Sequence, residues 1–232
     1  MGEALGALAT ARDRMSGALR RRRVALLESL LEPLPRPLRI LDVGGTQAFW
    51  NRAGFAGARD LEIVLLNRER VAVSGPPFSS VVGDGCRMPE FADGAFDVAF
   101  SNSVIEHAGD REEQRRMAGE IRRVGRRYFV QTPNRHFPVE PHFVFPLFQF
   151  LPLALRVLLL RRFSLGWVPR MPDAAEARAF VRSIRLLTGR ELAGLFPGAT
   201  LHRERVCGLT KSFVATDGFD APPPAAPYRK RG

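Results

Sequence analysis

The chain has 232 residues, of which 45% are hydrophobic and 25% charged, so it can bury a substantial core as an ordinary globular domain. This composition excludes a chain disordered throughout, a collagen and a small disulfide-stapled domain. Lys and Arg number 35 against 24 Asp and Glu, and the formal net charge of +11 favours acidic surfaces or ligands as partners.

The first 37 residues predict a helix over residues 3–31 and then a proline-rich linker. Leu27 and Leu31 fall on one face of this helix, and a run of arginines at 20–23 precedes them. Prolines at 33–37 end the helix, because proline lacks a backbone donor. A basic amphipathic helix of this kind packs on the domain or, alternatively, contacts anionic lipid or RNA.

Apolar runs alternate with turn or helical segments from residue 38 onward. The alternation predicts an α/β fold, a Rossmann-like, doubly wound, mostly parallel sheet between helices in three αβα layers. The expected strands are 39–43, 61–66, 80–82, 96–100, 128–130, 200–206 and 212–216. The last two have no helix between them, so they predict an antiparallel C-terminal edge strand. Helices are expected at 111–124 and 191–196, and none between the second and third strands.

We expect residues 38–216 to form one domain that carries an apolar insert at about 134–165, and residues 217–232 to be a disordered tail. The two cysteines, Cys86 and Cys207, match no metal or redox spacing, and the N-terminus lacks the pattern of a secretory signal. These features predict a cytoplasmic protein.

The first predicted strand ends in a loop where glycine lets the backbone approach a ligand closely, the sequence ILDVGGT over residues 40–46. A dinucleotide fingerprint starting at Gly44 would need glycine at the positions held by Thr46 and Phe49. An NAD(P)-binding oxidoreductase is therefore only an alternative function for this fold.

Three segments in order resemble motifs of the class I S-adenosylmethionine-dependent methyltransferases, particularly the small-molecule, methyltransferase type 11-like group. Asp42, Gly44 and Gly45 match the first motif, although its third glycine is absent. Residues 83–97 match the segment after the third strand, and SNSVIEH at 101–107 matches the motif after the fourth. The motifs cover about residues 38–135, and the strand order continues to about 216.

This resemblance implies S-adenosyl-L-methionine as the cofactor and no metal ion. The cofactor-binding residues it implies are Asp42, Gly44, Gly45, Asn67, Asp84, Gly85 and Asn102. Asp84 would accept a hydrogen bond from the adenine amine, and Asn67, or Glu69 two residues later, would accept from the ribose hydroxyls.

Methyl transfer from a sulfonium depends mainly on alignment, but a hydroxyl acceptor must also lose a proton to a base. Candidate bases follow the fourth and fifth strands: Glu106, His107, His136, Glu140 and His142. His107 is the predicted catalytic residue among them.

The resemblance to the small-molecule group implies a small acceptor, and the chain lacks the motifs with which nucleic-acid methyltransferases hold a flipped base. Nucleic acid is not an expected partner. The insert predicts a lid whose phenylalanines line an apolar acceptor pocket or enter an anionic membrane surface: Phe143, Phe145, Phe148 and Phe150. We expect methyl transfer to an apolar or lipid-like acceptor. The alternatives are a lid that touches no substrate and a non-enzymatic module peripheral to the inner face of the membrane.

Overall fold

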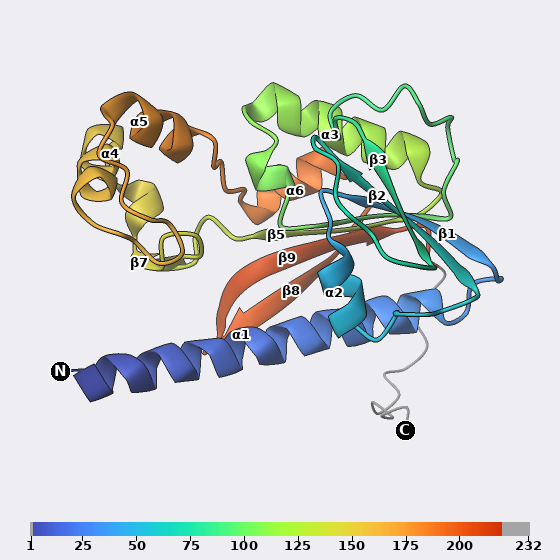
Figure 1. The fold of residues 1–232 in the computed structure, drawn as a ribbon, viewed down its shortest axis with the longest axis horizontal. Coiled ribbons are helices and arrows are strands. Elements are labelled where there is room, and N and C mark those ends of the chain that lie inside the picture. The colour runs from blue at the N-terminus through green and yellow to red at the C-terminus, as the bar shows by residue number, and fades with distance from the viewer. Residues whose placement is uncertain (1, 220–232) are drawn as a thin grey trace.

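The computed structural model describes residues 2–219, with side chains from residue 17 onward (Figure 1). Helix α1 spans Gly2–Leu31, which confirms the predicted N-terminal helix. Most of the tail that the sequence predicts to be disordered lies outside the described residues, and Asp217 still belongs to the last strand.

Seven strands form one sheet in the order β3-β2-β1-β4-β5-β9-β8. Their bounds are β1 Leu38–Val43, β2 Leu61–Asn67, β3 Phe78–Val82, β4 Val98–Asn102, β5 Tyr128–Pro133, β8 Thr200–Val206 and β9 Leu209–Asp217. The first five pair in parallel, and β9 runs antiparallel to β5 and to β8. The mostly parallel sheet with antiparallel pairing at its C-terminal edge is as predicted.

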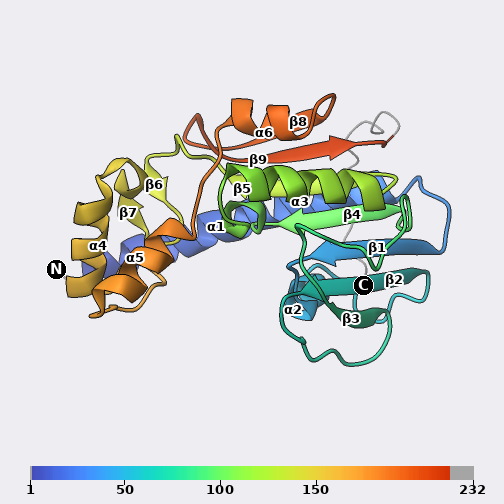
Figure 2. The same ribbon diagram turned by 90° about the horizontal axis from the view of Figure 1, so that it is seen from above.

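Helices cover both faces of the sheet, as Figures 1 and 2 show. Helices α3 (Arg111–Val124) and α6 (Gly189–Leu195) lie on one face. The second half of α1 and the short helix α2 (Gln47–Arg52) lie on the other. Asp110 begins α3 in a capping box with Glu113, which satisfies backbone donors that the first turn leaves free. The three predicted layers are therefore confirmed.

The connections on the β3 side of the sheet are loops. Residues 68–77 contain no helix, as the sequence predicts, because Gly75, Pro76 and Pro77 interrupt any helical pattern. Residues 83–97 also cross from β3 to β4 without a helix. The strand ends on this side are consequently bordered by loops.

A separate lobe follows β5, at the left in Figure 1. It contains β6 (Val139–Glu140), β7 (Phe145–Pro146), the 3-10 turn η2 (Phe148–Phe150), α4 (Leu153–Arg162) and α5 (Ala174–Arg182). Its own small core includes Phe143, Leu160 and Val181. The lobe therefore continues beyond the predicted insert through α5, which the sequence analysis did not predict. No described helix combines the length and the apolarity that a bilayer crossing requires.

The chain enters and leaves the lobe along two neighbouring segments. Asn134 pairs with Leu187 in an isolated parallel bridge, and the Arg135 N–H donates to the Leu187 carbonyl at 2.9 Å. The Arg185 N–H donates to the carbonyl of Glu106 at 2.8 Å. These backbone bonds fix the lobe beside the carboxyl ends of β4 and β5.

Candidate cofactor and acceptor sites

The first predicted ligand loop is held from behind by Asp42. This carboxylate is 1% exposed, and its Oδ2 accepts a hydrogen bond of 2.7 Å from Nε1 of the buried Trp50. Burial raises the pKa of Asp42 to about 7, although the hydrogen bond from Trp50 opposes that shift. A Cβ on Gly45 would lie 1.6 Å from the same oxygen, so only glycine fits there. Neither Asp42 nor Gly45 lines the cavity in front of the loop.

That cavity measures about 250 Å³ and lies at the carboxyl ends of β1, β2 and β3. The structure brings four of the predicted cofactor residues onto it, namely Gly44, Asn67, Asp84 and Gly85, together with His107. A Cβ on Gly44 would come within 2.6 Å of Val104, and one on Gly85 within 2.6 Å of Val43. The walls at these two glycines are therefore backbone, which suits close approach of a ligand. The crevice is open in this structure.

Two polar side chains at strand ends face this cavity. Asn67 is the last residue of β2 and donates through Nδ2 to the Gly45 carbonyl at 3.0 Å, which orients its amide. Asp84 follows β3, and its Oδ1 accepts the Cys86 N–H at 2.9 Å and lies 3.6 Å from Arg68. Glu69, the other ribose candidate, does not line the cavity.

Asn102 points elsewhere. Its Oδ1 accepts a hydrogen bond of 2.6 Å from Nη1 of Arg23, which also bonds Gln131 at 3.0 Å and Glu204 at 2.5 Å. The Arg23 side chain is 13% exposed, so this residue of the 20–23 run is not free to meet lipid or RNA. Sequence analysis missed this junction, because it joins α1 to strands far along the chain.

A chain of hydrogen bonds starts at the predicted catalytic residue. His107 ends the 3-10 turn η1 (Ile105–His107), and its Nε2 lies 3.0 Å from Nε2 of His142 in the lobe. Nδ1 of His142 lies 2.7 Å from Oε1 of the buried Glu140. Oε2 of Glu140 also accepts the backbone N–H groups of His142 and Phe143 at 2.7 Å each. A carboxylate on Nδ1 favours the tautomer of neutral His142 that has an accepting Nε2.

The environments of the two imidazoles separate their pKa values. Burial, followed by repulsion from His142, lowers the pKa of His107 to about 4. Burial also opposes a charge on His142, but the hydrogen bond to Glu140 and the charge of that carboxylate outweigh it and raise the pKa of His142. A proton shared by this pair is therefore favoured on His142.

Glu106 is buried next to the hydrogen-bond chain of His107, His142 and Glu140. Its Oε2 accepts from Thr132 Oγ1 at 2.9 Å, whereas Oε1 has no partner among the described residues. Burial raises the pKa of Glu106 to about 7. Glu106, His107 and His142 offer ligand atoms within 4.8 Å of one another and could hold a metal ion. Two imidazole nitrogens on one tetrahedral zinc lie about 3.3 Å apart, so a small opening of the present hydrogen bond would be required.

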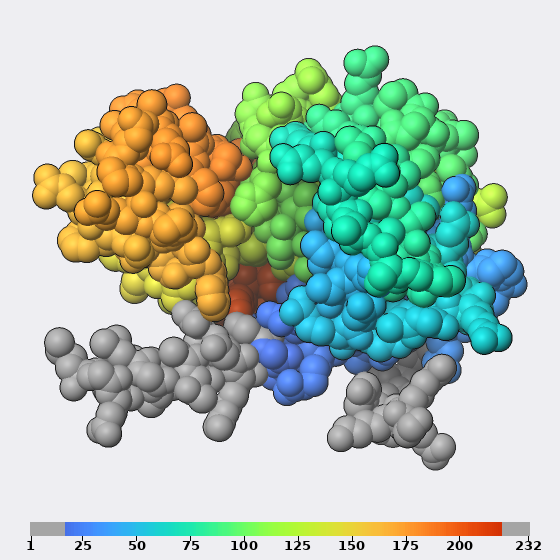
Figure 3. All heavy atoms as spheres, in the orientation of Figure 1, coloured from blue at the N-terminus to red at the C-terminus, as the bar shows by residue number. Residues whose placement is uncertain are grey.

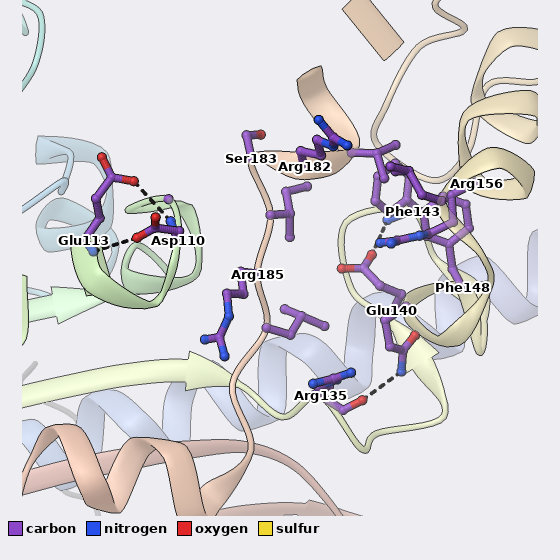
Figure 4. A pocket seen from close by; sticks show the side chains of 16 residues that line it. Asp110, Glu113, Arg135, Glu140, Phe143, Phe148, Arg156, Arg182, Ser183 and Arg185 are labelled. Carbon is purple, nitrogen blue, oxygen red and sulfur yellow. Dashed lines mark hydrogen bonds between the residues drawn. The ribbon is translucent and has the colours of Figure 1, made fainter. Parts of the chain in front are cut away.

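A second cavity of about 780 Å³ separates the lobe from the main body; Figure 3 shows the hollow between these two parts. The start of α3, the lobe and the connecting residues 182–186 line it, as does Glu140 (Figure 4). Of the four predicted aromatic residues, Phe143 and Phe148 line this cavity, whereas Phe150 is 49% exposed. The hydrogen-bond chain therefore runs from the cavity of about 250 Å³ at His107, called the cofactor-side cavity below, to the larger cavity at Glu140.

A family model described as "Methyltransferase domain" matches residues 52–128, which include Asn67, Asp84 and His107. This stretch, about a third of the chain, is similar to a methyltransferase domain. The family match indicates S-adenosylmethionine as the cofactor. The family match agrees with the motifs, the strand order and the open crevice at the strand ends.

Relatives of this methyltransferase domain are distant. An uncharacterized protein of Mycobacterium tuberculosis is 31% identical over 168 residues, a match that covers 61% of this chain and 55% of that protein. The chain thus spans about half the length of the curated relatives it matches. A SAM-dependent methyltransferase structure from Methanosarcina mazei is similar over 79% of this chain and 92% of its own, with 15% identity and a TM-score of 0.48. An O-methyltransferase family protein from Burkholderia thailandensis is similar over 84% and 54%, with 12% identity and a TM-score of 0.48.

Proposed function

We propose that the protein transfers the methyl group of S-adenosylmethionine to a small acceptor that occupies the cavity beside the lobe. One observation carries this proposal: the hydrogen-bonded side chains His107, His142 and Glu140 join the cofactor-side cavity to the larger cavity. Two neighbouring sites linked by groups that move protons are what transfer to an ionisable acceptor needs.

The residues of the smaller cavity are suited to the cofactor. Asp84 would accept from the adenine amine with the backbone of Gly85 beside it, Asn67 Oδ1 would accept from the ribose, and the backbone at Gly44 would border the amino-acid end. Asp42 and Gly45 shape the loop from behind. Asn102 is committed to Arg23, so we assign it no cofactor contact.

His107, which lines the smaller cavity, would be the base for a hydroxyl group that the acceptor extends from the larger cavity toward the cofactor. S-adenosylmethionine supplies a methyl group that is already electrophilic, so the protein must align the acceptor and remove its proton. Nδ1 of His107 would take that proton while the proton on its Nε2 passes to Nε2 of His142. Glu140, bonded to the other nitrogen of His142 at 2.7 Å, would stabilise the imidazolium. The opposite pKa shifts of the two histidines favour this direction of transfer.

Calorimetry with S-adenosylhomocysteine tests the cofactor part of the proposal. The intact protein should bind it, and Asp84→Ala should weaken binding by about tenfold or more, because a charge-assisted hydrogen bond is lost. Asp60→Ala is the matched control, since Asp60 is an exposed carboxylate paired with Arg36 outside the cavity. Absence of binding by the intact protein would disprove the proposal.

The acceptor can be found by incubating the protein and methyl-labelled cofactor with fractionated cell extract. Label should enter a small-molecule fraction and should not do so with Glu140→Gln. Label confined to protein or nucleic acid would contradict a small acceptor.

We also propose a peripheral contact with anionic membrane, which the exposed apolar side chains of the lobe favour. Of the eight large hydrophobic side chains exposed in the described part of the chain, six lie on the lobe: Leu147, Phe150, Leu155, Leu158, Phe163 and Trp167. Arg161 and Arg162 end α4 beside Phe163. Aromatic residues beside arginine are typical of interfacial membrane binding.

Vesicle flotation tests this contact. The protein should float with phosphatidylglycerol vesicles, less so at high salt, and the pair of changes Phe163→Ser and Trp167→Ser should remove flotation. Leu209→Ser is the control, because Leu209 is 52% exposed on the β8–β9 hairpin. Failure to float at every salt concentration would eliminate this contact.

No observation favours the NAD(P)-binding alternative. Phe49 stands where the fingerprint needs glycine, and its ring packs 5.3 Å from that of Phe100.

A further inference from the structure

The larger cavity is lined by arginines that the sequence analysis did not single out. Arg135 precedes β6, Arg156 lies on α4, and Arg182 and Arg185 lie at the exit from the lobe (Figure 4). Arginine is the side chain best suited to bind carboxylate or phosphate groups, because its planar fork donates two parallel hydrogen bonds. The question is which of these guanidinium groups are available to a ligand.

Arg185 and the acidic residues of this cavity already have partners. Arg185 bonds Glu191 at 2.5 Å and also bonds Gln114. Asp110 and Glu113 bond each other's backbone at the start of α3. Glu140 is bonded to the imidazole of His142 and to two backbone amides. These contacts leave the cavity without a carboxylate committed to its remaining arginines.

Arg156 is the least satisfied of those arginines. Its Nε is buried without a hydrogen-bond partner among the described residues. Burial, and then repulsion by the nearby Arg135, lower its pKa, and Glu140 opposes this only in part. Two cations that face a cavity, one of them partly stripped of water, are stabilised when an anion lies between them.

Apolar rings border the same space. Phe143 and Phe148 pack with their centroids 4.0 Å apart, and both line the cavity. A ligand that fills the site would thus meet guanidinium groups at one place and aromatic carbon at another.

We propose that the acceptor is an amphiphilic anion whose carboxylate or phosphate group binds Arg135 and Arg156 and whose apolar part packs on Phe143 and Phe148. The role of this ligand as a methyl acceptor rests on the proposed function, whereas the binding test below does not depend on it. It narrows the predicted apolar or lipid-like acceptor to one that carries an acidic group.

Calorimetry with three aromatic probes tests the inference on the full chain in the presence of S-adenosylhomocysteine. Benzoate or phenyl phosphate should bind, and benzamide, the neutral analogue of benzoate, should bind at least about tenfold more weakly. Competition by inorganic phosphate against phenyl phosphate would identify a phosphate site, and binding of benzoate alone a carboxylate site. Binding of neither anion, or equal binding of benzamide, would overturn the inference.

Two variants of one helix make the test specific. Arg156→Gln should weaken anion binding by about tenfold or more, and Arg156→Lys should restore part of it by keeping the charge. Arg162→Gln removes the same charge from an exposed position of α4 outside the cavity; it should leave anion binding in calorimetry unchanged and should affect only vesicle flotation. Unaltered anion binding by a folded Arg156→Gln variant would overturn the assignment.

The two proposals fail in different ways. Binding of S-adenosylhomocysteine without anion binding would remove the anionic acceptor and leave methyl transfer intact. Anion binding without S-adenosylhomocysteine binding would do the reverse.

Discussion

The two cavities of this protein are built in different ways. The cofactor-side cavity is walled by residues within a few positions of the ends of β1, β2, β3 and β4, three of them glycines, and by Met117 of α3. The larger cavity is walled by side chains from the lobe, α3 and the connecting residues 182–186, which only tertiary packing brings together. If the proposed assignment holds, recognition of the cofactor depends on residues close to strand ends, whereas recognition of the acceptor depends on side chains and on how the lobe is placed.

The most severe test of this contrast is Gly45→Ala. The new Cβ would overlap the Asp42 carboxylate, so the loop or the carboxylate must move. We expect at least a hundredfold loss of S-adenosylhomocysteine affinity and a destabilisation of roughly 2–4 kcal/mol. Calorimetry and thermal unfolding measure both effects. Gly119→Ala, in the interior of α3 with open space around it, is the control: it should leave binding unchanged and stabilise the protein by up to about 1 kcal/mol. Normal binding by Gly45→Ala would contradict the backbone-based account.

Substitutions in the hydrogen-bond chain His107–His142–Glu140 should leave cofactor binding unchanged. Glu140→Gln or His142→Gln should lower kcat for a hydroxyl acceptor by about 10²–10⁴, with S-adenosylhomocysteine affinity unchanged. His202→Gln is the control, because His202 bonds Thr216 on the β8–β9 hairpin.

The activity should also depend on pH in a defined direction. His142 must be neutral to accept a proton, and Glu140 raises its pKa above the ordinary 6.5. Activity should therefore be lost as the pH falls through that raised value, and Glu140→Gln should move the midpoint to lower pH. Activity lost to a chelator and restored by zinc would instead assign Glu106, His107 and His142 to a metal ion.

The lobe should be separable from the cofactor site in stability. Phe143 is 3% exposed in the lobe core, and Phe143→Ala should cost about 3 kcal/mol there. Hydrogen exchange should increase in α4 and α5, while protection of β1 and β2 and binding of S-adenosylhomocysteine persist. Loss of all protection together would show that the two parts unfold as one unit.

The last expected effect, on stability alone, concerns Asp42. Its pKa is raised from 3.8 to about 7, so the folded state holds a proton that the unfolded state releases between these values. The free energy of unfolding should therefore decrease as the pH rises from about 4 to 7. Asp42→Asn should flatten this slope, by an amount on the order of a few kcal/mol across the window, in denaturant titrations at several pH values. An unchanged slope would mean that Asp42 is ionised in the fold.

The sequence predicted best what depends on neighbouring residues. The strands, α3 and the positions of Gly44, Asn67, Asp84 and Gly85 follow from short-range patterns, because the carboxyl ends of parallel strands lie at one edge. Asn102 shows the limit of that logic. Side chains alternate between the faces of a strand, and a pattern of residues does not show that Arg23 would meet this one.

The lobe was harder to predict for a related reason. Its chain folds on its own small core, so α4 carries no single apolar stripe facing the sheet, and α5 was missed. His107, Glu140 and His142 were all candidate bases, but their order in one hydrogen-bond chain depends on contact between η1 and the lobe.

The chain enters and leaves the lobe at two neighbouring residues, so the lobe is an insertion between adjacent points of the backbone. Because Asn134 and Leu187 already lie side by side, a short turn could join them and leave the sheet, α3 and α6 continuous. Exchange of the intervening residues would therefore alter the larger cavity and leave the lining of the smaller cavity in place.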